Sequence, residues 1–95
     1  PWRRAQIAAA QGRWAAAEAF AARAAELEPF FLNDRVLRAE ALVRTGRKSE
    51  ARAELAKVLK TLSERGERSA VPGYEGTVWA FDRKEFDRVA ASAGR

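Results

Sequence analysis

The sequence contains no cysteine, no histidine and no methionine. These absences exclude thiol nucleophiles, thiolate zinc sites, imidazole general bases and the Ser-His-Asp arrangement. The lack of cysteine also removes any disulfide framework. It assigns no compartment, because cytoplasmic and periplasmic domains can both lack cysteine. Localisation therefore stays open, and little remains for catalysis beyond carboxylates.

Long apolar runs are also missing. Apolar runs such as those at residues 15–17 and 19–22 are short and rich in alanine, and Glu18 and Arg23 interrupt them. A membrane-spanning helix needs about 20 apolar residues. The chain starts at Pro1 rather than at a methionine, so we expect a piece of a longer protein. Membrane contact or catalysis is then expected only of segments outside it.

The remaining composition is that of a soluble globular domain, with 47% apolar and 33% charged residues. The net charge of +5 lies entirely in the middle of the chain. The basic residues of this middle segment include Arg35, Arg38, Arg44, Arg47, Lys48, Arg52, Lys57 and Lys60. Interleaved glutamates dilute their potential, and no RNA-binding motif or zinc finger accompanies them. Binding to nucleic acid or an anionic surface is therefore kept only as an alternative.

Apolar residues at helical spacing predict four helices in the first two thirds of the chain. Gly12 divides the first two, Pro29 ends the second or lies just beyond it, and Gly46 closes the third in the left-handed conformation. Asn33 and Asp34 are candidate N-caps of the third helix. The expected buried stripes are Trp14, Ala17, Ala21, Ala24 and Leu27 or Glu28; Val36, Ala39, Leu42 and Val43; and Ala51, Leu55, Val58, Leu59 and Leu62.

The last third is less regular. Pro72 can start a helix that runs through Tyr74, Val78, Trp79 and Phe81. A strand at residues 77–81 is the alternative, and the absence of a second convincing strand favours the helix. A turn at Asp82 or Lys84 then leads to a last helix lined by Phe86, Val89, Ala90 and Ala93.

The sequence repeats itself with a period of 34 residues. At this spacing Gly12 and Arg13 recur as Gly46 and Arg47, and several alanines recur as well. Two helices per period of 34 residues is the signature of the tetratricopeptide repeat. Small residues allow the helices of each pair to approach closely, Ala5 against Ala17 and Ala39 against Ala51.

The chain resembles the tetratricopeptide repeat (TPR) family at these positions. The matching residues are Ala5, Gly12, Trp14, Ala17, Ala24 and Pro29 in one repeat and Ala39, Leu42, Gly46, Ala51 and Leu55 in the next. The resemblance implies an all-α fold of stacked helix-turn-helix repeats, a short right-handed α-solenoid with five to six helices. We expect one domain over residues 1–95, with repeats at about 1–31 and 32–65 and a degenerate third repeat or cap at about 69–94.

The resemblance also implies a function. The first helix of each TPR pair lines a concave groove that binds another protein or a peptide, without catalysis, cofactor or metal. By position, the groove residues are Trp2, Arg3, Gln6, Asn33, Val36, Leu37, Glu40, Arg44, Tyr74, Glu75 and Val78. Asn33, Gln6 and Glu40 would bond a peptide backbone, and Arg44 and Arg3 would meet a carboxylate.

Two other interpretations of these residues stay open. Val36, Leu37 and Val78 have the spacing of core residues, and charged residues on a helix are usually a solvated face. The repeats could equally serve self-association, as a homo-oligomer, or a spacer role in a larger protein. The close carboxylates Asp82 and Glu85 are spaced like a capping box, which explains them without catalysis.

Overall fold

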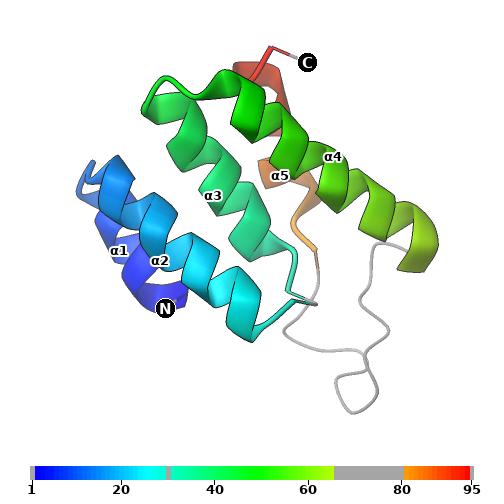
Figure 1. The fold of residues 1–95 in the computed structure, drawn as a ribbon, viewed down its shortest axis with the longest axis horizontal. Helices are drawn as coiled ribbons and strands as arrows, with labels where there is room; N and C mark the ends of the chain where they lie inside the picture. The colour runs from blue at the N-terminus through cyan, green and yellow to red at the C-terminus, as the bar shows by residue number, and fades with distance from the viewer. Residues whose placement is uncertain (1, 30, 66–80, 95) are drawn as a thin grey trace.

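The computed structural model describes residues 2–29, 31–65 and 81–94. Within these ranges the chain is all-α, as predicted, with five helices and no strand. The helices are α1 (Trp2–Ala10), α2 (Trp14–Leu27), α3 (Asn33–Arg44), α4 (Lys48–Arg65) and α5 (Arg83–Ser92). Figure 1 shows α2, α3 and α4 side by side, with α1 and α5 behind them.

The turns after α1 and after α3 have the same geometry. Gly46 adopts positive φ, at 81°, as predicted, and Gly12 adopts it as well, at 75°. The N–H of Arg13 donates to the carbonyl of Ala8 at 2.8 Å, and the N–H of Arg47 donates to the carbonyl of Leu42 at 2.7 Å. Each glycine N–H donates three residues back as well. This is the Schellman arrangement, in which the glycine occupies the left-handed position that other residues adopt at a cost.

The start of α3 differs from the prediction. Neither Asn33 nor Asp34 is the N-cap; α3 begins at Asn33 itself, and the preceding Leu32 makes no side-chain cap hydrogen bond. The Oδ1 of Asn33 instead accepts a hydrogen bond from the backbone N–H of Asp82 at 3.0 Å. The side chain of Asn33 is therefore used to join the start of α5 to the start of α3.

The start of α5 follows the prediction. Asp82 is the N-cap, and its side chain accepts a hydrogen bond from the N–H of Glu85 at 3.1 Å. The predicted lining residues Phe86, Val89, Ala90 and Ala93 are all buried. The predicted helix that leads up to α5 lies outside the described residues except for Phe81, which is not helical.

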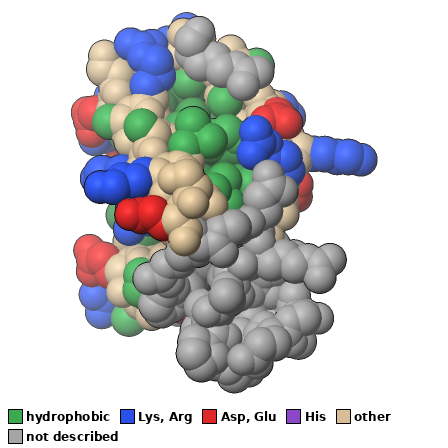
Figure 2. Space-filling model, turned by 90° about the vertical axis from the view of Figure 1, so that its right-hand side faces the viewer, with side chains coloured by type: hydrophobic (Ala, Val, Ile, Leu, Met, Phe, Trp, Pro, Cys, Tyr) green, Lys and Arg blue, Asp and Glu red, His purple; other side chains and the backbone are tan. Residues whose placement is uncertain are grey.

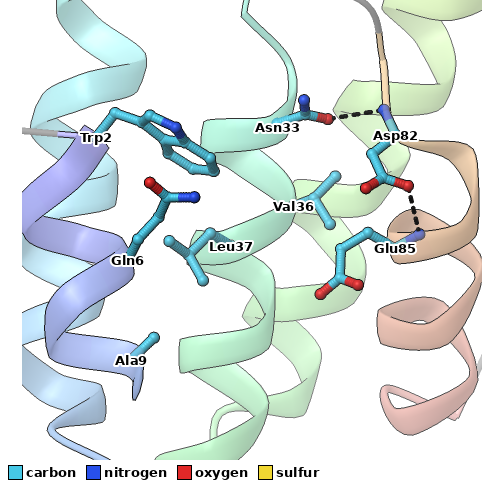
Figure 3. A pocket seen from close by; sticks show the side chains of 8 residues that line it. All are labelled: Trp2, Gln6, Ala9, Asn33, Val36, Leu37, Asp82 and Glu85. Carbon is cyan, nitrogen blue, oxygen red and sulfur yellow. Dashed lines mark hydrogen bonds between the residues drawn. The ribbon is translucent and has the colours of Figure 1, made fainter. Parts of the chain in front are cut away.

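Helix α3 is the centre of the fold, because it packs against each of the other four helices. Helix α1 also packs on α2, and α4 on α5. Ala5, Ala17, Ala39 and Ala51 are all fully buried, as expected of small residues between closely packed helices. Helix α5 lies on the opposite side of α3 from α1 (Figure 3).

The main hydrophobic core is shared by α3, α4 and α5. Its buried residues are Leu32, Val36, Ala39, Leu42, Ala51, Leu55, Val58, Leu62, Phe86, Val89, Ala90 and Ala93. A smaller cluster of Ala8, Ala17 and Ala41, with Trp14 and Phe20 at its edge, joins α1 and α2 to α3. Two predicted core positions are wrong. Of the alternatives Leu27 and Glu28 at the end of α2, Leu27 is 54% exposed and Glu28 is exposed too, and Leu59 on α4 is 47% exposed.

Candidate functional site

A groove lies along α3, between α1 and α5 (Figure 3). We call it the central groove. It has a volume of about 270 Å³. Its described lining residues are Trp2, Gln6 and Ala9 from α1, Asn33, Val36 and Leu37 from α3, and Asp82 and Glu85 from the start of α5. Because one helix forms its floor and two helices form its walls, the groove is held by three separate elements.

The floor of the central groove is apolar. Val36 is 1% exposed and belongs mainly to the core, whereas the neighbouring Leu37 is partly exposed. The ring of Trp2 packs edge-on against Phe31, with 5.0 Å between ring centroids, and it points toward α3 (Figure 3). An apolar side chain of a ligand would therefore find its contacts on Leu37 and Trp2.

The structure brings together five residues that the sequence predicted for a groove, namely Trp2, Gln6, Asn33, Val36 and Leu37. Arg3 is exposed and is not among the lining residues. Tyr74, Glu75 and Val78 lie outside the described residues.

Glu40 and Arg44, the remaining groove candidates, are engaged in contacts within the chain. Arg44 lies over the ring of Trp14, 5.1 Å from its centroid, and its Nη2 is 3.8 Å from Oε2 of Glu40. The Nη2 of Arg88 donates to the Oε1 of Glu40 at 2.9 Å. Neither residue is among the described lining residues of the central groove.

Asp82 and Glu85 are lining residues that the sequence did not assign to the groove. In the sequence, their spacing is that of a capping box, which indicates a role in helix capping and gives no sign of a groove. The contact that positions them is between Asn33 and the backbone of Asp82, which is 49 residues further along the chain. No local pattern encodes that contact.

Arg88 ties the acidic wall to the floor helix. Its guanidinium bonds the carboxylate of Glu85, with Nε 3.2 Å from Oε2, and also the carboxylate of Glu40. The hydrogen bond to Glu85 has the largest effect on the pKa of Arg88 and the bond to Glu40 the next largest. Both raise this pKa above its ordinary range. Glu85 therefore meets the groove as half of an ion pair.

The arginines of the basic middle segment are largely paired inside the protein. Glu54 is 3% exposed and accepts from Nη1 of Arg35 at 2.8 Å and from Arg38. Arg38 and Arg47 also lie within 3.5 and 3.6 Å of Glu18. We call this set the buried ion-pair network; it joins α2, α3 and α4. Its positive charges face internal carboxylates, which weakens the case for a nucleic-acid surface.

A second, smaller groove separates α4 from α5. It has a volume of about 160 Å³ and is lined by Arg52, Leu55, Ala56, Leu59, Phe86 and Ala90. Figure 2 shows one face of the molecule, on which hydrophobic side chains gather among charged ones.

Asp34, in the first turn of α3, is a buried carboxylate. It is 0% exposed, and neither of its side-chain oxygens has a hydrogen-bond partner among the described residues. Burial, and then the negative charge of Glu28, raise its pKa from 3.8 to about 7, while the positive charge of Arg35 acts in the opposite direction. Asp34 therefore changes its charge near neutral pH.

The described ranges contain neither a metal-site arrangement nor a membrane-spanning helix. No group of three or more acidic side chains there has the arrangement of a metal site. Among the same residues, no helix is both long and apolar enough to span a membrane.

Comparison with known proteins gives no family assignment. No family model matches the chain, and no curated protein or solved structure has significant similarity to it. Function is therefore inferred from the site itself.

Proposed function

We propose that this chain is a non-catalytic scaffold that binds a peptide segment in the central groove, as part of a TPR-like stack of helix pairs. The segment belongs to another protein or to another part of the parent chain. The observation that carries the proposal is a groove along α1 and α3, the first helices of the two proposed repeats. It combines apolar contacts on its floor with the amide of Gln6 on one wall and two carboxylates on the other.

The repeat architecture rests on two supports. The turns after α1 and α3 have matching hydrogen bonds at a spacing of 34 residues. Each turn joins two helices that pack together with buried alanines between them. Equivalent helix pairs stacked on one another are the basis of solenoid repeats, and their concave faces are binding surfaces.

The size and chemistry of the central groove favour a peptide over a small molecule. Its volume of about 270 Å³ lies below the roughly 300–1,000 Å³ of pockets that enclose drug-sized ligands. The amide of Gln6 makes no side-chain hydrogen bond within the described part of the chain, so it can bond a peptide backbone. Leu37, which lines the same groove as Gln6, offers an apolar contact. Helix grooves recognise peptides through such anchors.

Selection from an unbiased peptide display library tests this function. Enriched peptides should bind the wild-type protein and the Leu27→Ser variant, but not Leu37→Ser. The two substitutions are identical in kind, and Leu27 is an exposed leucine outside the groove. We expect Leu37→Ser to weaken binding by about 1–3 kcal/mol, the value of a buried apolar side chain. Failure to enrich any peptide, or equal binding by Leu37→Ser, would refute the proposal.

A further inference from the structure

The charge of the central groove is opposite to that of the protein as a whole. The chain has 18 Lys and Arg residues against 13 Asp and Glu. The charged side chains that line the described groove are nevertheless both acidic, Asp82 and Glu85. A ligand in the groove therefore meets a local potential that the overall charge of the chain does not predict.

Asp82 supplies the uncompensated charge. Its carboxylate points toward the groove (Figure 3), and Oδ1 accepts a hydrogen bond from the backbone N–H of Glu85. No Lys or Arg pairs with Asp82 in the described part of the chain. Glu85 differs, because Arg88 already bonds its carboxylate. Arg88 is thus shared between the carboxylates of Glu85 and Glu40, and it does not neutralise the charge of Asp82.

Arg44, the cation of the floor helix that the sequence predicted for the groove, makes other contacts. Arg44 lies over Trp14 and beside Glu40, and it is not a lining residue. Trp2, at the opposite wall from Asp82, presents an aromatic ring to the groove (Figure 3). The described lining of this wall is uncharged, so it does not oppose a positive charge in the groove.

We propose that the central groove binds a basic amphipathic segment, with an apolar side chain on Leu37 and Trp2 and a Lys or Arg side chain directed to Asp82. This inference rests on the proposed function and adds the sign of charge of the partner. Charge complementarity carries it, because electrostatic matching across an interface selects partners and suppresses like-charged ones.

The test uses labelled peptides that share leucine positions and differ only in lysine, glutamine or glutamate at the positions between them. Their affinities are measured by fluorescence anisotropy at low and at moderate salt. The net charge of +5 alone favours the glutamate peptide. The groove instead predicts tightest binding of the lysine peptide. The two explanations therefore give opposite orders of affinity.

Asp82→Asn separates the groove charge from helix capping, because asparagine caps a helix as well as aspartate does. We expect this variant to bind the lysine peptide about threefold more weakly, the value of one exposed charge pair, and to bind the glutamine peptide unchanged. Asp87→Asn is the matched control: it removes the same charge from the same helix, at a residue paired with Arg83 outside the groove. It should leave all affinities unchanged.

The outcomes distinguish the two proposals. If Leu37→Ser abolishes binding but the peptides bind equally, or the glutamate peptide binds best, the basic-segment inference is wrong and the peptide-binding function stands. An equal effect of Asp82→Asn and Asp87→Asn also overturns the inference. If no peptide shows binding that depends on Leu37, both proposals fail.

Discussion

Replacing Asp34 with asparagine should change how the stability of the protein depends on pH. In the folded protein this carboxylate is fully buried without a hydrogen-bond partner among the described residues, and its pKa is about 7. In the unfolded chain the pKa returns to about 3.8. The asparagine side chain has nearly the same shape as that of aspartate and no charge, so the variant isolates the ionisation of this one group.

The direction follows from proton binding. Between about pH 4 and pH 7 the folded protein holds a proton on Asp34 that the unfolded chain has released. The preference of the folded protein for protonated Asp34 therefore adds its full contribution to stability below about pH 4. This contribution is lost as pH rises through about 7. The shift of about 3 pKa units corresponds to about 4 kcal/mol, at roughly 1.4 kcal/mol per unit. We expect about 2–4 kcal/mol, because local relaxation lowers the cost of a buried charge.

Urea unfolding followed by far-UV circular dichroism gives the quantity needed. The free energy of unfolding of Asp34→Asn minus that of the wild type should rise by about 2–4 kcal/mol between about pH 4.5 and pH 8. The same difference for the exposed control Asp87→Asn should stay nearly flat. A flat difference for Asp34→Asn, or one that falls with pH, would refute the reasoning about burial.

Three further substitutions test the packing. Glu54→Ala should lower the free energy of unfolding in urea by about 3 kcal/mol, because it leaves two arginines of the buried ion-pair network without their shared carboxylate. The control Glu50→Ala, at an exposed residue, should lower it by under about 1 kcal/mol. Equal losses would contradict the network. Gly46→Ala should cost about 1–2 kcal/mol through its positive φ alone, since nothing lies within 4 Å of an added Cβ, and an unchanged stability would argue against that turn geometry. Leu42→Ala should reduce the free energy of unfolding by about 3 kcal/mol and lower the melting temperature, whereas Leu59→Ala, at a half-exposed residue, should lower it much less. The reverse order would mean that the α3–α4 core is packed differently.

Local signals in the sequence were enough to predict most helix boundaries. Gly12 and Gly46 end their helices by adopting a conformation that glycine tolerates best, and that preference is a property of the residue itself. The N-cap at Asp82 is likewise local, because the bond spans only three residues. The all-α class and the last helix followed directly from these signals and from apolar spacing.

Contacts between distant residues could not be predicted in this way. Asn33 has the side chain of a good N-cap, but the backbone of Asp82 uses it instead. Arg38 looked like part of a basic surface, but it lies against Glu54, which is 16 residues away. In both cases a tertiary partner competes with the local role, and only the packing of the helices decides the outcome.

The same distinction applies to the candidate groove. The residues of α1 and α3 followed from repeat positions, because equivalent helix positions face the same way. The acidic wall from α5 did not, since it depends on where the last helix docks against α3. The sequence therefore predicted a groove whose charge is recognisable only in the folded protein.

An isotope-edited NMR titration with the leucine–lysine peptide tests the central claim most directly. The account predicts that backbone amide shifts will concentrate on α1, on α3 around Leu37 and at the start of α5 around Asp82, and that Leu37→Ser will remove them. Shifts confined to the outer face of α4, or an unchanged spectrum at saturating peptide, would contradict the claim that the central groove is the binding site.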